Sequence, residues 1–288
     1  MSQFSASLAV YFKVPDQGMT EYDILSRCTA TPLRPTRPKG PHRFLVAAHT
    51  VQPWAFPHFY PKPWLLQFVN EAHVRYYVEL RQPSGAILAK HELLNRPNRH
   101  PTRDIAALKF VNEAQALDDI RSRGVPFTPL TLRINPLSPG EATDVVGYEV
   151  VEDKENIDDV SEEDRPGRGL VWSRREAEET FVDDGDVFKE FRGRADPTMI
   201  FRRPRAFLAL RTARQTFVKV DTDLKAGMCG GAVLDMNLEC CGCIEGVVPT
   251  PPPGANIPED RRLLAGAACM IESTDLANFL EDDDVFSF

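Results

Sequence analysis

The sequence lacks long apolar runs and clustered basic residues, and each absence excludes a class of protein. No stretch approaches the roughly 20 apolar residues that a membrane-spanning helix needs. The net charge is −8 and the isoelectric point about 5.4, whereas a nucleic-acid surface needs clustered Lys and Arg. The one basic stretch, RPTRPKGPHR at 34–43, is broken by prolines and predicts a solvated loop. We therefore expect no membrane span and no nucleic-acid partner.

A secretory signal and a zinc motif are also missing. The N-terminal stretch MSQFSASLAVYFKVPDQ has neither a basic start nor a small-residue cleavage site. Four of the six cysteines crowd together without two CxxC pairs or a nearby histidine, so we expect no metal and no cofactor. These four are Cys229, Cys240, Cys241 and Cys243. The pattern favours free thiols in a reducing, intracellular and cytoplasmic compartment.

Short apolar runs separated by Pro, Gly and Asn clusters fill most of the chain. Runs such as ASLAVYFKV, RYYVELR and WLLQFVNE (64–71) predict strands, and the 24 prolines disfavour a helical protein. The runs form two series around the proline-rich stretch at 125–141, which predicts a linker. The C-terminal stretch STDLANFLEDDDVFSF predicts a short capped helix. Strands at this spacing are typical of sandwiches or barrels.

Two stretches predict surface loops. Residues 152–165, EDKENIDDVSEEDR, are mostly acidic and offer almost nothing to bury, so we expect a loop that is mobile or ordered only by a partner. Residues 249–260, PTPPPGANIPED, predict a polyproline-type loop.

Three residues far apart in the sequence have the chemistry of a nucleophilic site. Cys229 lies among glycines in KAGMCGGAVLD, and a thiol becomes a nucleophile when an oriented base takes its proton. His49 lies in FLVAAHTV, where an apolar strand runs into a small-residue turn. Asp104 precedes the apolar run in HPTRDIAALKF, where a carboxylate can hold an imidazole N–H.

In this order, LVAAHT, DIAALKF and DTDLKAGMCGGAVLD resemble the three active-site segments of chymotrypsin-fold, trypsin-like proteases. In the last segment, Asp221 lies eight residues before Cys229. This spacing resembles that of HtrA-type proteases, in which an Asp lies eight residues before the nucleophile. GEATDVVGYEV at 140–150 is similar to the strand that opens their second barrel. The form G-x-C-G-G resembles that of picornavirus-type cysteine proteases.

The resemblance implies an all-β fold of two six-stranded antiparallel barrels with a short C-terminal helix. Residues 1–130 would form the first barrel, which carries the histidine and the aspartate. Residues 131–288 would form the second barrel, which carries the cysteine, an acidic insertion at about 152–195 and the C-terminal helix and tail.

The resemblance also implies a cysteine peptidase and assigns roles. Cys229 would attack the scissile carbonyl, His49 would take and return the proton, and Asp104 would orient the imidazole. The N–H groups of Gly227 and Cys229 would form the oxyanion hole. We expect the nearby imidazolium to lower the pKa of the Cys229 thiol.

The expected partner is a peptide or protein substrate that pairs as an added strand. Glu245, Gly246 and Val247 lie in CGCIEGVV, where that strand edge is expected. Asp223 lies six residues before Cys229, where trypsin-type enzymes place a carboxylate that binds basic side chains of the substrate. In the HtrA-like alignment, Asp221 is the matching residue instead. The acidic loop 152–165 and the C-terminal tail are candidate docking surfaces for a protein partner.

Two alternatives share the same site. Met228 and Ala232 replace an Asp and a Pro that are usual in the family. The unusual cysteine nucleophile and the long insertions favour one alternative, a catalytically inactive homologue that serves as a structural or regulatory subunit of a larger assembly. A redox-sensing thiol at Cys229 is the other alternative.

Overall fold

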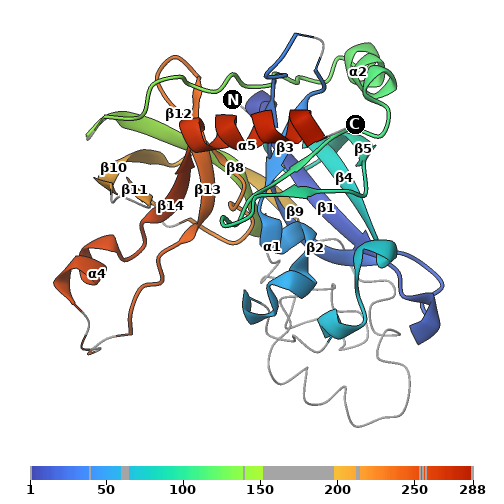
Figure 1. The fold of residues 1–288 in the computed structure, drawn as a ribbon, viewed down its shortest axis with the longest axis horizontal. Coiled ribbons are helices and arrows are strands. Elements are labelled where there is room, and N and C mark those ends of the chain that lie inside the picture. The colour runs from blue at the N-terminus through green and yellow to red at the C-terminus, as the bar shows by residue number, and fades with distance from the viewer. Residues whose placement is uncertain are drawn as a thin grey trace.

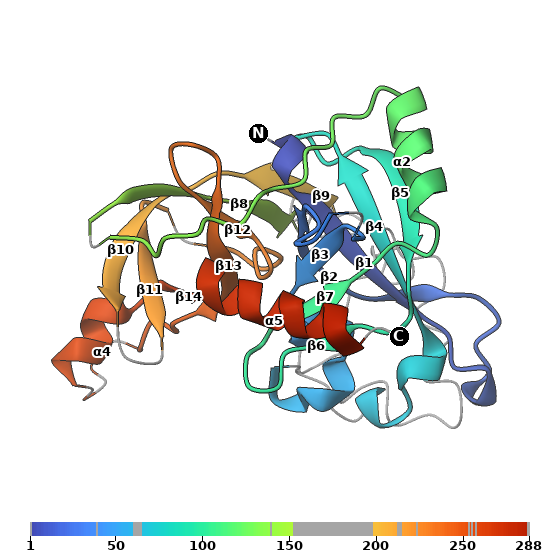
Figure 2. The ribbon, with the colours of Figure 1, turned by 45° about the horizontal axis from the view of Figure 1, so that its top comes forward.

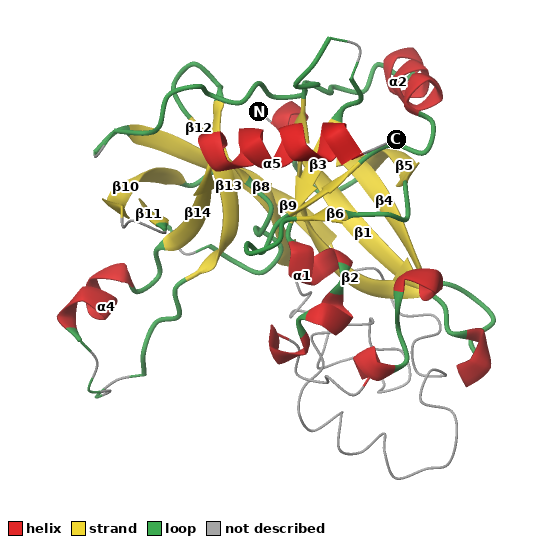
Figure 3. Ribbon diagram, viewed as in Figure 1, coloured by secondary structure: helices red, strands yellow, loops and turns green. Residues whose placement is uncertain are grey.

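The structure is a computed structural model, which describes residues 2–286 except residues 39, 60–64, 139, 152–197, 212–214, 223, 253, 255 and 257. Two antiparallel sheets dominate these residues, and the helices are few and short (Figures 1 and 3). The prediction of an all-β fold with antiparallel barrels and a short C-terminal helix is confirmed. The acidic loop 152–165, the proposed insertion 152–195 and Asp223 lie outside the described residues.

The first sheet has seven strands. They are β1 (Ala6–Phe12), β2 (Asp23–Leu33), β3 (Arg43–Val46), β4 (Val74–Arg81), β5 (Ile87–Leu93), β6 (Asn98–Arg99) and β7 (Ala106–Leu108). Their order across the sheet is β5-β4-β1-β2-β3-β7-β6. The sheet curls on itself, because the Leu94 N–H donates to the Lys109 carbonyl oxygen at 2.8 Å and joins the end of β5 to the chain after β7.

The second sheet also has seven strands. They are β8 (Ala142–Val151), β9 (Thr198–Arg202), β10 (Arg205–Arg211), β11 (Thr216–Val220), β12 (Ala232–Leu234), β13 (Cys240–Val247) and β14 (Ala268–Glu272). Their order is β10-β11-β14-β13-β12-β8-β9, and β10 also pairs with β8. That extra pairing closes six of the strands into a barrel and leaves β9 outside the ring.

Four α-helices accompany the sheets in the described residues: α1 (Ala48–Val51), α2 (Glu113–Ser122), α4 (Glu259–Leu264) and α5 (Ser273–Phe286). Helix α5 lies across both barrels (Figures 1 and 2). Its Leu276, Phe279 and Leu280 are buried in one apolar cluster with residues from each barrel. None of the helices in the described residues is long and apolar enough to cross a membrane.

The apolar cluster under α5 joins the two barrels. It contains Leu45 and Ile105 from the first barrel together with Leu234 and Ile271 from the second. All strands of the first sheet precede residue 109, and all strands of the second follow residue 141. The proposed boundary near residue 130 stays a prediction, because the two halves share this part of the core.

The described part of the run at 64–71 is not a strand. It holds the 3₁₀ turn Leu65–Gln67, and its last residue begins a second one, Glu71–His73. Leu66 and Val69 are buried, whereas Gln67 and Phe68 between them are exposed. Burial at a spacing of three residues suits a tight helical turn, whereas a strand would bury alternate residues.

A buried ionic cluster lies on the outer face of the first barrel. Glu79 accepts hydrogen bonds from Arg27 at 2.5 Å and from Arg81 at 2.6 Å, and all three side chains are nearly inaccessible. The Tyr148 hydroxyl of the second barrel donates to the Arg81 carbonyl oxygen at 3.1 Å. The cluster therefore lies where the second barrel covers the first.

Candidate active site

His49 and Asp104 form a doubly hydrogen-bonded pair. His49 lies in α1, the single helical turn that follows β3. Its backbone N–H donates to Asp104 Oδ1 at 2.7 Å, and its ring Nδ1 lies 2.6 Å from Asp104 Oδ2. The side chains are 19% and 13% exposed, respectively. The carboxylate therefore holds the Nδ1–H, which leaves Nε2 as the basic nitrogen.

The turn before Asp104 is fixed by His100. The Nδ1 atom of His100 accepts the N–H groups of Thr102 at 3.2 Å and Arg103 at 3.1 Å. Burial and the Arg103 charge lower the pKa of His100, which keeps Nδ1 available as an acceptor. The Phe279 ring of α5 lies 5.2 Å from the His100 ring. The aspartate thus rests on a turn that α5 supports.

The loop that carries Cys229 is anchored to both barrels. Met228 is buried in the core of the second barrel. From the first barrel, the Thr29 N–H donates to the carbonyl oxygen of Gly227 at 2.7 Å and to that of Cys229 at 3.2 Å. Gly227 has φ of 95°, which an L side chain rarely adopts. These contacts fix the loop on each side of the cysteine.

Gly230 brings this loop against the segment that leads to His49. Its φ is 84°, and a Cβ there would collide with the Thr29 carbonyl oxygen and lie 3.2 Å from the Ala47 nitrogen. Only glycine permits this approach. Since Ala47 is two residues before His49, the cysteine loop passes close to the segment that leads into the histidine turn.

The electrostatics of Cys229 differ from the sequence-based expectation. Burial, followed by the Asp104 charge, raises the pKa of the Cys229 thiol to about 12, and Cys269 and Glu245 add to this increase. We expected a nearby imidazolium to lower it. The structure instead places the thiol in a partly buried site with carboxylates nearby, so the resting cysteine is protonated.

The two N–H groups assigned to the oxyanion hole are available. Within the described residues, neither the Gly227 N–H nor the Cys229 N–H donates to an acceptor on another residue. The Cys229 N–H lowers the pKa of its own thiol, against the larger effects of burial and the Asp104 charge. Their use as an oxyanion hole stays a prediction.

The residues expected at the substrate-binding edge lie at the end of β13. Gly246 and Val247 pair with Cys269 and Ala268 of β14 on one side. In the described residues no strand pairs with them on the other side, and Val247 is exposed. Glu245 turns instead toward the first barrel, where it contacts Arg103 and the backbone of Asp104.

Sequence reasoning missed three residues around His49. The exposed Phe59 ring lies 5.0 Å from the His49 ring. The buried thiol of Cys28 interacts with the Ala47 backbone and the Thr50 hydroxyl, and burial raises its pKa to about 12. Arg103 forms an ion pair with Glu245. Of these three residues, only Arg103 could have been found from the sequence, because it is adjacent to Asp104.

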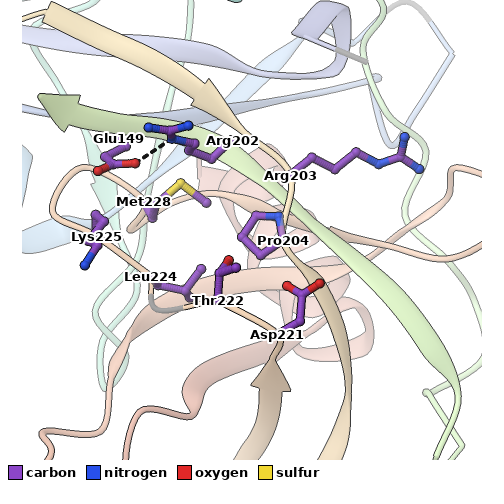
Figure 4. Close-up of a pocket in the computed structure, with 9 residues that line it drawn as sticks. All are labelled: Glu149, Arg202, Arg203, Pro204, Asp221, Thr222, Leu224, Lys225 and Met228. Atoms are coloured by element: carbon purple, nitrogen blue, oxygen red, sulfur yellow. Dashed lines mark hydrogen bonds and ion pairs between the residues drawn. The ribbon is translucent and has the colours of Figure 1, made fainter.

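A polar cavity of about 730 Å³ lies beside the same loop. The lining residues, drawn in Figure 4, come from β8, the end of β9, the turn between β9 and β10, and the chain between β11 and Cys229. They are Glu149, Arg202, Arg203, Pro204, Asp221, Thr222, Leu224, Lys225 and Met228. The residues His49, Asp104 and Cys229 do not line it, so this cavity is separate from the candidate triad.

Comparison with known proteins finds similar solved structures but no matching family. No family model and no curated protein matches the chain. The active form of the Rv3671c protease from M. tuberculosis is 14% identical with a TM-score of 0.47, and the match covers 97% of this chain and 81% of that one. An inactive form of that protease is 13% identical with a TM-score of 0.45, covering 96% and 87%. Values this low carry no inference about activity.

Proposed function

We propose that the chain is a cysteine endopeptidase in which Cys229 is the nucleophile, His49 the base and Asp104 the orienting carboxylate. The observation that carries the proposal is the His49–Asp104 pair, in which one carboxylate accepts both the ring and the backbone N–H of the histidine. A second observation supports the proposal: a Cβ added at Gly230 would lie 3.2 Å from the Ala47 nitrogen, so the cysteine loop passes close to the segment that leads to His49.

The proposed reaction begins from neutral partners. Because burial and carboxylates raise the pKa of Cys229, the thiol gives its proton to His49 Nε2 as sulfur attacks the scissile carbonyl carbon. Asp104 stabilises the imidazolium that forms. The N–H groups of Gly227 and Cys229 stabilise the oxyanion of the tetrahedral intermediate.

The second half of the reaction releases both products. The imidazolium protonates the amine as the C–N bond breaks, which leaves a thioester on Cys229. Water then attacks the thioester carbonyl carbon and gives a proton to His49. The C–S bond breaks, the imidazolium returns the proton to the Cys229 sulfur, and the carboxylic acid product leaves. No step needs a metal or an oxidant.

The substrate class follows from the free edge of β13. Gly246 and Val247 would pair with an extended peptide through backbone hydrogen bonds, as an added strand does. The exposed Phe59 beside His49 offers an apolar surface for a substrate side chain.

An inactive homologue that acts as a structural or regulatory subunit is the second candidate. The raised pKa of Cys229 favours it, since a thiol with a pKa of about 12 is almost fully protonated at neutral pH. In this case the His49–Asp104 pair would be retained for structure alone.

The test is cleavage of a random peptide mixture, with new termini identified by mass spectrometry. The proposal predicts cleavage by the wild type, loss in Cys229→Ala and retention in Cys241→Ala, which removes another thiol of the second barrel. The Cys229→Ser variant should lose most activity, because a site arranged for a thiol serves an alcohol poorly. Equal cleavage by wild type and Cys229→Ala, or none by folded wild type, would contradict the proposal.

A further inference from the structure

The carboxylate of Glu245 is fully engaged by the segment that carries Asp104. Its Oε1 accepts the Asp104 backbone N–H at 2.8 Å and Arg103 Nε at 3.2 Å. Its Oε2 accepts Arg103 Nη2 at 2.9 Å. Two parallel N–H bonds from one guanidinium form the strong, bidentate type of ion pair.

This ion pair crosses from one barrel to the other. Glu245 lies on β13 of the second barrel, whereas Arg103 and Asp104 precede β7 of the first. Arg103 Nη2 also donates to Gln215 Oε1 at 2.9 Å, and Gln215 Nε2 donates to the Met270 carbonyl oxygen at 3.1 Å. The segment before β7 is therefore tied to two places on the second barrel.

The position of Asp104 depends on these contacts. The Asp104 side chain binds His49, while its own N–H is held by Glu245. His100 supports the same turn from within the first barrel. A shift of the turn away from Glu245 would move the Asp104 carboxylate relative to the imidazole.

We propose that Glu245 is a positioning residue, which together with Arg103 fixes Asp104 against His49 and aligns the barrel that carries the base with the barrel that carries the nucleophile. The inference rests on the proposed function for its consequence in catalysis. The hydrogen bonds of Glu245 with Arg103 and Asp104 do not depend on that function.

A role in positioning differs from the substrate contact expected from the sequence. The Arg103 and Glu245 side chains are each only 17% exposed, and both Glu245 oxygens already have partners. A group that acts through Asp104 should affect turnover more than substrate affinity.

The experiment compares Glu245→Ala, Glu245→Gln and a matched control. Glutamine keeps one oxygen that can accept the Asp104 N–H, whereas alanine removes every contact. The control is Glu141→Ala, which removes the carboxylate of another partly buried Arg–Glu pair, that of Arg133 with Glu141, with exposures of 17% and 28%. That pair lies beside Cys241, near the opposite end of β13.

Two quantities are measured on each variant, and thermal unfolding confirms that each is folded. The first is kcat and KM for a peptide cleaved by the wild type. The second is the NMR signal of the His49 ring Nδ1–H, which is strongly deshielded in a short hydrogen bond to a carboxylate.

The proposal predicts that Glu245→Ala lowers kcat on the order of 10- to 100-fold with little change in KM. The ring proton should move upfield or disappear through exchange. Glu245→Gln should recover much of both, and Glu141→Ala should match the wild type.

A Glu245→Ala variant with unchanged kcat and an unchanged ring proton would overturn the inference, as would a change in KM alone. If the wild type cleaves no peptide, the proposed function fails. In that case the ring proton of the folded variants still decides whether Glu245 positions Asp104.

Discussion

At the scale of single residues, the environment of Cys229 determines how the site can work. Burial disfavours the charged form of the Cys229 thiol, and the carboxylates of Asp104 and Glu245 disfavour a further negative charge on its sulfur. A preformed thiolate–imidazolium pair is therefore not the resting state. The proposed reaction therefore requires that the Cys229 thiol gives its proton to His49 as the sulfur attacks.

The pH dependence of Cys229 alkylation tests this resting state. Since the thiolate is the reactive form and the pKa is raised to about 12, the rate with iodoacetamide should rise about tenfold per pH unit from pH 7 to pH 9. The measurement is mass spectrometry of the peptide that contains Cys229. A plateau reached below pH 8 would show a stable thiolate and contradict this description.

The contact made by Gly230 gives a second prediction. Gly230→Ala should destabilise the protein by at least about 3 kcal/mol, because the new Cβ meets backbone atoms of the first barrel in addition to the cost of a positive φ. Urea unfolding measures this change.

Gly124→Ala is the matched control for Gly230→Ala. Gly124 also has a positive φ, 63°, but an added Cβ meets nothing within 4 Å. It should cost only about 1 to 2 kcal/mol. Equal losses in the two variants would mean that Gly230 makes no essential close contact.

The triad candidates were predicted from the sequence because three motifs, LVAAHT, DIAALKF and DTDLKAGMCGGAVLD, occur in the order found in chymotrypsin-fold proteases. In the structure His49 contacts Asp104, whereas the catalytic roles and a hydrogen bond between Cys229 and His49 stay predictions. The role of Glu245 was not predictable, because its partners lie 141 and 142 residues away. The raised pKa of Cys229 was not predictable either. It results mainly from burial, which depends on how the loops assemble.

At the scale of elements, the strands of the first barrel are held together by the buried cluster of Glu79, Arg27 and Arg81. Burial alone would raise the pKa of Glu79, but the two arginines outweigh it and the pKa is lowered. The cluster joins β2 to β4 where the second barrel covers them.

The Glu79→Gln variant should lose about 3 to 5 kcal/mol of stability, because two buried arginines lose their counter-charge. In the wild type, the contribution of Glu79 is present above its unfolded-state pKa, near 4.5, and is lost as pH falls through the lowered folded-state value. Urea unfolding at several pH values checks both statements. A loss below 1 kcal/mol would show that the cluster is not important for stability.

Elements with strong alternation were predicted well, and those with weak patterns were not. The predicted strands in ASLAVYFKV and RYYVELR correspond to β1 and β4. Helix α2 was not predicted, because only Ala116 and Ile120 of its residues are buried and the apolar stripe is short. The turn at Leu65–Gln67 was taken for a strand, since a short apolar run does not distinguish the two.

At the scale of the whole molecule, the shared core predicts that the barrels unfold together. Leu45 and Ile105 of the first barrel are buried in the same cluster as Leu234 and Leu276 of the second half. Calorimetry should therefore give one transition, with calorimetric and van't Hoff enthalpies that agree. Two resolved transitions would show that the barrels are independent domains.

The proposal that Cys229 is the nucleophile and His49 its base is best tested by trapping the covalent intermediate. The protein would be mixed with an activated acyl-amino-acid ester, quenched in acid during turnover and mapped by mass spectrometry. We expect a thioester on Cys229 in the wild type, and at least about 100-fold slower acylation in His49→Ala. Acylation elsewhere, or equally fast acylation of Cys229 without His49, would contradict it.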